Sequence, residues 1–342
     1  MTPAASGHVA RFAGTAREVG IAAGRALGPR LEANIARYLR DRPQHPDALD
    51  LAELRRGAIP WLRALPDRFQ DELVGLAEGA DVPLQRVAEW NYVEQCADDG
   101  CSAFVGLIDG HAWVARNNDM FAPGIWGHAT VREITGRIPT LCFGQAGDVF
   151  TATGVNRERL WLHHHALTVS DAPRPGRPHM AGWILLTEML ETCSTIAEVE
   201  ARLDEVDRDE GMLLVAVDGA SDEVAILECG RSTHVRRPQD GAWLIATNHA
   251  VVLDEPAPNG DSRSRQARME SLAGGLTGRQ PGIRLPDDLI AILADDAVER
   301  RGPDFATVYA TVACPAEGSL WFTFGAVPAA SLGDWQPVAW PW

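Results

Sequence analysis

The most constraining feature of this chain is the dipeptide Asp109-Gly110, which separates two runs of alternating apolar residues. Both residues tolerate the positive φ angles of a two-residue hairpin turn, so the pattern predicts two adjacent antiparallel strands. In an unbulged hairpin the turn also fixes the register, because paired residue numbers sum to a constant. The sequence therefore predicts that Cys101 lies opposite Asn118.

The expected neighbours of Cys101 suit a nucleophile. Arg116 and Asp119 lie close to the same strand end in this register. A nearby guanidinium, amide and carboxylate can activate a thiol and hold an oxyanion. The alternative is that Cys101 is a small buried hydrophobe, which is the usual fate of a free cysteine. The hairpin alone leaves both interpretations open.

The composition excludes several classes of function. The chain has 342 residues, of which 46% are hydrophobic, so it can bury a large core. Its net charge of −16 argues against nucleic acid and membrane surfaces as partners. All 31 basic residues are arginines, which excludes a Schiff-base lysine, a P-loop lysine and a serine–lysine dyad. The chain also lacks the G-x-S-x-G, H-E-x-x-H and G-x-G-x-x-G motifs.

Cysteine and histidine usage predicts neither a disulfide framework nor a metal site. The six cysteines include no C-x-x-C pair. In the histidine run 163–165, neighbouring side chains on a strand would point to opposite faces, so at most two could share an ion. The chain shows no apolar signal-peptide region and no membrane span. We expect a cytoplasmic protein with no metal and no cofactor.

Apolar periodicity predicts a helical first hundred residues followed mostly by strands. Helices are expected at 9–39 with a break near Gly28-Pro29, at 51–65, at 68–77, from Pro83 through Trp90, and at 180–191, 195–206, 263–275 and 286–296. Strands are expected at 102–108, 111–117, 128–135, 139–144, 158–163, 212–218, 223–229, 233–236, 242–247, 307–313 and 319–325. This order indicates packed sheets with helices on the outside.

Three polar clusters lie far from Cys101 in the sequence. Residues 247–249 follow an expected strand, 261–265 open an expected helix, and 154–156 precede the strand that ends in the histidine run. Each cluster taken alone has an ordinary explanation, as a turn, a solvated helix face with cap residues, or a polar strand end.

Taken together and in order, these segments resemble one known family. The segments are Gly100-Cys101-Ser102, Arg116-Asn117-Asn118-Asp119, Thr247-Asn248-His249, and Asp261-Ser262-x-x-Arg265 with Arg268-Met269-Glu270. The stretches FAGTAREVGIAAGRALG, ELVGLAEGADVPLQRVAEWN and ATVACPAEGSLWFTFGAVP add to the likeness. The chain resembles, over nearly its whole length, the acyl-CoA:6-aminopenicillanic acid acyltransferase (isopenicillin N acyltransferase-like) family of N-terminal nucleophile hydrolases. This resemblance implies an α+β fold, an αββα sandwich with a helical amino-terminal segment.

The resemblance also implies self-processing. The Cys101 thiol would attack the Gly100 carbonyl, and hydrolysis of the resulting thioester would divide the chain into 1–100 and 101–342. The two cleaved chains are expected to remain associated as a heterodimer. The new α-amino group of Cys101 would serve as the base, because an α-amine titrates near neutral pH.

Site roles follow from the same resemblance. It implies that Asp119 holds the amino group, that Asn248 donates to the oxyanion, and that Arg265 supports the nucleophile.

Further substrate-binding candidates are Arg116 and Asn118, placed by the hairpin register, with Asn156 and His165. His165 stands where relatives tend to carry an asparagine, which leaves the second oxyanion donor open.

The activity expected from this resemblance is cleavage of a small-molecule amide, an N-acylated amine or amino acid, through a Cys101 thioester. Two alternatives stay open. One is an acyl-CoA-dependent N-acyltransferase of natural-product biosynthesis, with acyl-CoA as co-substrate and acyl donor. The other is a catalytically silent member that only binds a ligand. The absence of a clear coenzyme A signature favours hydrolysis.

Overall fold

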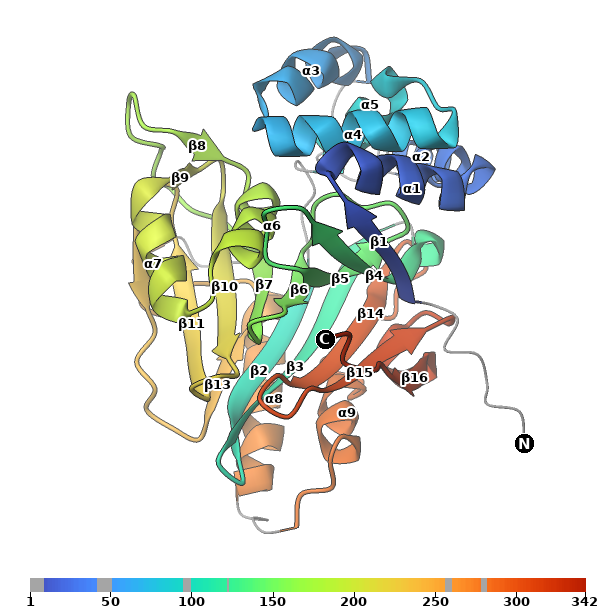
Figure 1. The fold of residues 1–342 in the computed structure, drawn as a ribbon. Coiled ribbons are helices and arrows are strands. Elements are labelled where there is room, and N and C mark those ends of the chain that lie inside the picture. The colour runs from blue at the N-terminus through green and yellow to red at the C-terminus, as the bar shows by residue number, and fades with distance from the viewer. Residues whose placement is uncertain (1–8, 42–50, 95–99, 122, 256–259, 278–281) are drawn as a thin grey trace, which may run out of the picture.

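Two β-sheets stacked face to face form the centre of the molecule (Figure 1). The computed structural model describes residues 9–41, 51–94, 100–121, 123–255, 260–277 and 282–342. Sheet A has eight strands in the order β1-β4-β5-β6-β7-β10-β11-β12, and sheet B has six in the order β13-β2-β3-β14-β15-β16. A short parallel pair, β8 with β9, lies apart from both sheets.

The strands match most of the predicted positions within two residues. Sheet A contains β1 (Val9–Gly14), β4 (Trp126–Ile134), β5 (Thr140–Gln145), β6 (Thr153–Asn156), β7 (Leu160–Leu167), β10 (Gly211–Asp218), β11 (Glu223–Cys229) and β12 (His234–Arg236). Sheet B contains β13 (Trp243–Ala246), β2 (Gly100–Ile108), β3 (His111–Phe121), β14 (Phe305–Cys314), β15 (Ser319–Phe324) and β16 (Asp334–Pro337). The separate pair is β8 (His179–Met180) and β9 (Asp207–Arg208). The short strands β6, β8, β9 and β16 were not predicted, nor were the continuations of β3 to Phe121 and of β7 to Leu167.

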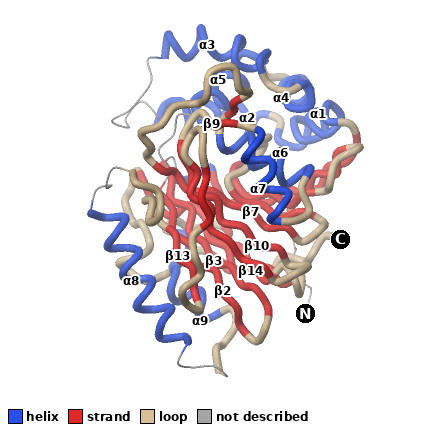
Figure 2. Tube along the Cα trace, turned by 90° about the vertical axis from the view of Figure 1, so that its left-hand side faces the viewer, coloured by secondary structure: helices blue, strands red, loops and turns tan. Residues whose placement is uncertain are grey.

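Helices cover the outer face of each sheet (Figure 2). Helices α6 (Gly182–Thr192) and α7 (Ile196–Glu205) bury their apolar faces against β7, β10 and β11 of sheet A. Helices α8 (Gly260–Thr277), α9 (Asp287–Leu293) and α10 (Ala329–Leu332) pack against sheet B. The layer order is therefore helix, sheet, sheet, helix, which is the αββα sandwich that the sequence predicted.

Five helices precede the sandwich. They are α1 (Ala16–Leu27), α2 (Pro29–Asp41), α3 (Leu51–Ala64), α4 (Asp67–Ala80) and α5 (Leu84–Glu94). Helices α1 and α4 approach very closely, because a Cβ atom at Gly20 would lie 2.2 Å from the Glu72 carbonyl oxygen. The predicted break near Gly28-Pro29 is confirmed, with α1 ending at Leu27 and α2 beginning at Pro29.

The prediction of a helix from residue 9 was wrong at its start. Residues 9–14 form strand β1, which pairs in parallel with β4 at the edge of sheet A. Helix α1 begins only at Ala16, where Thr15 and Glu18 form a capping box that satisfies the first free backbone N–H groups. Residues 9–14 are therefore a strand because they pair with the edge strand β4, although their apolar spacing also fits a helix.

The central hairpin has the predicted register. Cys101 lies opposite Asn118, and the turn residues Asp109 and Gly110 have φ angles of 51° and 88°. Gly100 pairs with Asp119 at the far end of the hairpin. Local turn chemistry was therefore sufficient to place the thiol among its strand neighbours.

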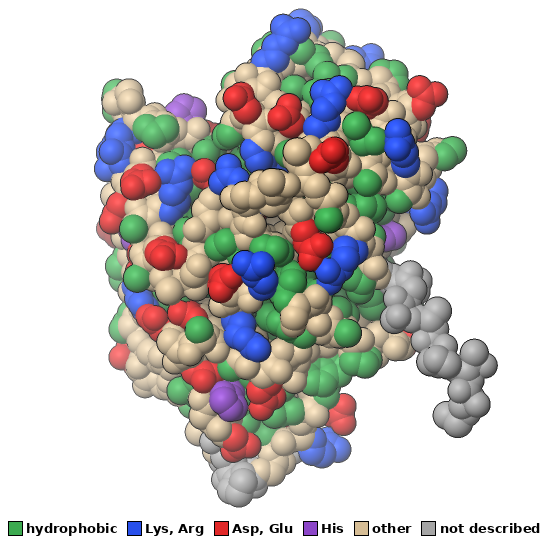
Figure 3. Space-filling view, in the orientation of Figure 1, with side chains coloured by type: hydrophobic (Ala, Val, Ile, Leu, Met, Phe, Trp, Pro, Cys, Tyr) green, Lys and Arg blue, Asp and Glu red, His purple; other side chains and the backbone are tan. Residues whose placement is uncertain are grey.

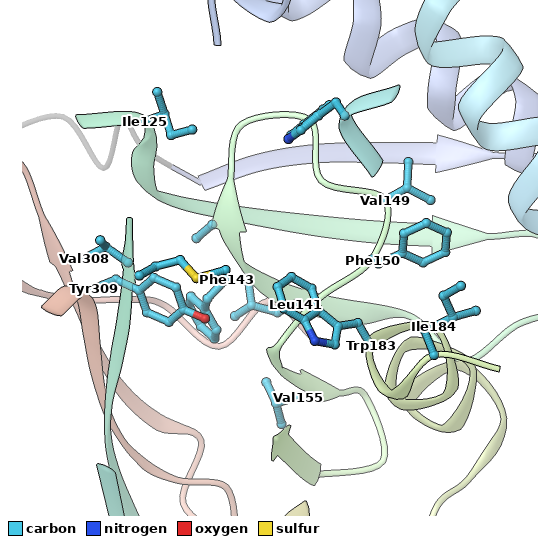
Figure 4. Packing of buried hydrophobic residues seen from close by; sticks show 14 of the residues in the cluster. Ile125, Leu141, Phe143, Val149, Phe150, Val155, Trp183, Ile184, Val308 and Tyr309 are labelled. Carbon is cyan, nitrogen blue, oxygen red and sulfur yellow. The ribbon is translucent and has the colours of Figure 1, made fainter. Parts of the chain in front are cut away.

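Aromatic and aliphatic side chains fill the space between the sheets. Figure 4 shows Leu141, Phe143 and Val155 from sheet A together with Val308 and Tyr309 from sheet B. On the face shown in Figure 3, acidic and basic side chains are interspersed. In the described part of the chain, no helix combines the length and apolar character needed to cross a bilayer. The five described cysteines, 101, 142, 193, 229 and 314, are all buried, and none of them forms a disulfide bond.

Candidate active site

Cys101 is the second residue of β2, and its thiol points into the space between the two sheets. The residue is fully buried in the intact chain. Arg116 Nη2 lies 3.3 Å from the sulfur, and Asn118 Oδ1 lies 3.8 Å from it. Both of these neighbours come from β3, so the hairpin places them beside the sulfur.

Arg116 is a fully buried cation aimed at this thiol. Its Nη2 also donates to Asn118 Oδ1, and its Nη1 donates to the Ala152 carbonyl oxygen at 2.8 Å. Among the described residues, no carboxylate forms an ion pair with Arg116. A guanidinium held beside a sulfur favours the thiolate form, which is the nucleophilic one, and Asp119 is the carboxylate whose charge also interacts with Arg116.

The backbone of Cys101 is held from the β13 side of β2, which is opposite to the β3 side. Its N–H donates to Asn248 Oδ1 at 3.0 Å, and its carbonyl oxygen accepts from Arg265 Nη1 at 2.6 Å. Arg265 Nη2 donates to the same Asn248 oxygen at 2.8 Å, and Arg265 Nε donates to Asp261 at 3.1 Å. Asn248 and Arg265 thus meet at the amide nitrogen that would become the free α-amine.

Asp119 completes this group of residues. Its Oδ1 accepts a 2.6 Å hydrogen bond from the Thr307 hydroxyl, while Oδ2 has no hydrogen-bond partner in the described parts of the chain and lies 3.9 Å from Arg265 Nη1. Burial raises the pKa of Asp119 to about 6, although Arg265, Thr307 and more distant arginines oppose the shift. A carboxylate with this pKa can exchange protons near neutral pH.

Gly100 meets a steric requirement of the site. A Cβ atom at this position would lie 3.0 Å from the Phe305 ring and 3.1 Å from Asp119 Cβ. Only glycine therefore lets the Gly100–Cys101 peptide sit against Asp119 without moving these neighbours.

Two hydrogen bonds, one from the backbone and one from the side chain, hold Asn248 in place. Its backbone N–H donates to Ser262 Oγ at 2.8 Å, and its Nδ2 donates to the Ala166 carbonyl oxygen at 3.2 Å. These bonds connect the loop after β13 with helix α8 and with the end of β7. The oxyanion role of Asn248 stays a prediction.

The histidine run lies on β7, where the side chains alternate as expected. His163 and His165 share the face between the sheets, with ring centroids 5.2 Å apart, and His164 packs against Trp183 on the other face at an interplanar angle of 48°. Burial, with a smaller contribution from Arg116, lowers the pKa of each of the three imidazoles. All three are therefore neutral at pH 7.

The partners of His163 and His165 give the two rings opposite tautomers. His165 Nδ1 lies 2.6 Å from the Thr247 carbonyl oxygen, which can only accept, so this nitrogen carries the proton and Nε2 is an acceptor. His163 Nδ1 accepts from the Trp161 indole at 2.8 Å, so His163 carries its proton on Nε2. Neutral His165 thus cannot donate from Nε2 to an oxyanion.

The structure does not bring Asn156 to the site. Its Nδ2 donates to the carbonyl oxygens of Leu190 and Cys193, and its Oδ1 accepts from the Leu160 N–H. Alternation along β6 explains this placement, because Val155 faces the core between the sheets whereas Asn156 faces the end of α6. The contacts of Asn156 are structural and lie away from Cys101, and its predicted role in substrate binding stays untested.

Sequence reasoning missed two supporting residues. Thr307 reaches Asp119 because β14 pairs with β3, and Arg300 donates to Asp261, the partner of Arg265. Period-two alternation of residues 307–313 predicted the strand but not its neighbour in the sheet. No local signal identified either residue.

Comparison with known proteins supports the fold. No protein-family model and no curated protein sequence matches this chain. A penicillin V acylase from Agrobacterium tumefaciens aligns with a TM-score of 0.51 at 15% identity, over 70% of this chain and 86% of that chain. A mutant conjugated bile acid hydrolase from Clostridium perfringens gives 0.47 at 12% identity, over 69% and 96% of the two chains. An N-acylethanolamine-hydrolyzing acid amidase ortholog from Caenorhabditis elegans gives 0.47 at 16% identity, over 63% and 93%. The chain therefore has an αββα sandwich fold similar to that of the penicillin V acylase.

Proposed function

We propose that this chain is a self-processing cysteine amidohydrolase that cleaves a small N-acylated amine or amino acid. One observation carries the proposal. Arg116 contacts the sulfur of Cys101, while Asn248 and Arg265 hold the two backbone atoms of the same residue. A structural cysteine needs no such set of partners, and the sandwich fold supports the same conclusion.

Maturation begins with attack of Cys101 Sγ on the Gly100 carbonyl carbon. The C–S bond forms, the Gly100–Cys101 C–N bond breaks, and the departing nitrogen takes up a proton. Water then hydrolyses the thioester, which leaves a carboxyl group on Gly100 and a free thiol and α-amine on Cys101. Asp119 lies beside this peptide with a pKa of about 6, so it is suited to hold the new ammonium group.

The mature site repeats this chemistry on an external amide. The α-amine accepts the thiol proton, and the thiolate attacks the substrate carbonyl carbon. The tetrahedral oxyanion collapses as the C–N bond breaks, and the proton passes to the leaving amine. Hydrolysis of the acyl-enzyme then releases a carboxylic acid and regenerates Cys101.

Buried ion pairs would keep the two cleaved chains together. Arg68 of α4 donates to Glu191 of α6 through Nε at 2.8 Å and through Nη2. Glu72 of α4 pairs with Arg132 of β4 at 3.2 Å. Each pair joins the segment before Cys101 to the segment after it, so separating the chains would expose unpaired charges from a buried interface. A heterodimer is the state that these contacts favour.

The test is intact mass analysis of purified protein. We expect one chain that ends at Gly100 and another that begins at Cys101. The Cys101→Ala variant should remain a single chain, and Cys101→Ser should be cleaved slowly or not at all. Cleavage of Cys101→Ala at the same bond would assign the cut to another protease.

A second measurement addresses turnover. Processed protein is incubated with small N-acyl amides and with acyl-CoAs, and mass analysis follows acyl adducts on the chain that begins at Cys101. Adducts from amides that decay in water support hydrolysis. Adducts from acyl-CoA alone that decay only when an amine is added would support acyl transfer instead.

A further inference from the structure

We propose that His163 is the second hydrogen-bond donor to the oxyanion, acting through its Nε2–H from the sheet opposite Cys101. This inference rests on the proposed function of Cys101 as an acyl-accepting nucleophile. It assigns a catalytic role to a residue that the sequence marked only as part of a histidine run.

A neighbour on the same strand determines that the proton of His163 is on Nε2. Trp161 Nε1 has only an N–H to offer, and it lies 2.8 Å from His163 Nδ1, which must therefore accept. The other nitrogen of the neutral ring then carries the hydrogen. His163 Nε2 is fully buried and has no hydrogen-bond partner among the described residues. Buried N–H groups in folded proteins are normally paired, so this donor is available to an acceptor on a bound substrate.

The position of the ring relates it to Cys101. Strand β7 packs against β2 across the sandwich, and His163 lies on the β7 face that points between the sheets, where it stacks on His165. His165 is bonded to the carbonyl of Thr247, next to Asn248, which holds the Cys101 N–H. The charge of Arg116, whose Nη2 is 3.3 Å from the sulfur, acts on the His163 ring.

The neighbouring histidines cannot replace this donor. His165 presents an acceptor at Nε2, and His164 points to the opposite face against Trp183. With Asn248 on one side and His163 on the other, the oxyanion would receive two N–H donors from different sheets. Such preorganised donors lower the barrier because they require no reorganisation as charge develops.

Two substitutions separate the Nε2–H from the rest of the ring. His163→Asn places an oxygen near the former Nδ1, so it keeps an acceptor for Trp161 but lacks the distal donor. His163→Gln extends an amide N–H toward the former Nε2 position. His164→Asn is the matched control, because it changes the adjacent buried histidine on the other face of the strand.

The experiment compares two reactions of Cys101 in processed protein. Acylation by acetyl, hexanoyl and phenylacetyl p-nitroanilides passes through an oxyanion, whereas alkylation by iodoacetamide is a displacement at carbon that forms none. We expect His163→Asn to slow acylation on the order of 100-fold while alkylation stays within about threefold of wild type. His163→Gln should recover part of the acylation rate, and His164→Asn should match wild type in both reactions.

Other results would overturn the inference in distinguishable ways. If wild type acylates and His163→Asn acylates equally fast, His163 binds only a buried water or packs passively. An equal loss of acylation and alkylation would show a general disturbance of the nucleophile and would also remove the proposed role. A wild-type protein that forms no Cys101 adduct with any of the three amides would overturn the proposed function together with this inference.

Discussion

Two buried arginines in this molecule have very different surroundings. Arg68, between α4 and α6, is paired with Glu72 and Glu191. Burial alone would lower the pKa of Arg68, but the two carboxylates raise it above its usual range. Arg116, between the sheets, has a thiol, an amide oxygen and a backbone carbonyl as neighbours and, among the described residues, no carboxylate.

Under the proposed function, this difference distinguishes a charge that holds the fold together from one that serves the reaction. In the Arg68 group each charge is offset locally, so the group stabilises the interface between helices and sheet. Four buried polar atoms around Cys101 have no hydrogen-bond partner within the described segments: Asp119 Oδ2, Arg116 Nε and the Nε2 atoms of His163 and His165. Buried polar groups are normally satisfied, so a concentration of exceptions marks a place where a substrate or a reacting group completes the network.

The largest expected effect comes from exchanging each arginine for methionine. Arg116→Met should lower turnover on the order of 1,000-fold, because the thiolate loses its cation, with a small change in stability. Arg68→Met should leave Glu72 and Glu191 buried with too little positive charge, which costs about 3–5 kcal/mol of unfolding free energy. Denaturant unfolding and turnover measured on both variants check the contrast. Loss of turnover in Arg68→Met without loss of stability would contradict the distinction between the two arginines.

The next prediction concerns the cost of burying Asp119. Its pKa in the folded chain, about 6, lies above the ordinary value near 4, so the folded chain holds this proton more tightly than the unfolded chain. The contribution of Asp119 to stability is therefore most favourable at acid pH, and about 2 kcal/mol is lost as pH rises from 4 to 6.

Asp119→Asn should remove this pH dependence, because an amide does not titrate. Unfolding free energies at pH 4 and pH 7, measured in the uncleavable Cys101→Ala background, give the comparison. We expect the difference between the two pH values to be smaller in Asp119→Asn. Turnover of the same substitution with Cys101 intact should fall, because the ammonium group loses its anchor. Retained turnover would reduce Asp119 to a buried strand residue.

Asn248 allows a sharper comparison of acceptor and donor at one position. Asn248→Ala removes both, and turnover should fall on the order of 100-fold with a smaller change in KM. Asn248→Asp keeps an oxygen for the Cys101 N–H and for Arg265 but removes the side-chain N–H. If Asn248 donates to the oxyanion, both variants should be slow. An active Asn248→Asp variant would limit the residue to its observed acceptor contacts.

The sequence predicted those parts of the site that depend on local chemistry. Asp109-Gly110 fixed the pairing of Cys101 with Asn118, because a two-residue turn determines its own register. Placement of Arg265 and Asn248 came from resemblance, since they lie 164 and 147 residues from Cys101 and no local pattern brings them there.

The parts that were missed depend on tertiary neighbours. Strand β1 was assigned to a helix because its apolar spacing fits both periods, and only the open edge of β4 decides between them. Asn156 lies on a short strand, and its side chain points toward the end of α6, a contact that the sequence does not reveal. The tautomer of His163 depends on Trp161, which is two residues away. The tautomer of His165 depends on Thr247, which is distant in the sequence.

The smallest expected effect tests whether Thr307 tunes Asp119. The Thr307 hydroxyl donates to Asp119 Oδ1 at 2.6 Å and also accepts from the Arg300 N–H at 3.0 Å. A hydrogen bond to the charged carboxylate lowers its pKa, so Thr307→Val, which keeps the side-chain shape, should raise the pKa of Asp119 further.

The acid limb of the pH–rate profile should therefore move upward in Thr307→Val by up to about one unit. Thr307→Ser retains the hydroxyl and serves as the matched control, with a profile close to that of wild type. If Thr307→Val and Thr307→Ser have the same profile, the acid limb does not report Asp119. In that case only Arg116 and the histidines would support the contrast between the site around Cys101 and the ion pairs around Arg68.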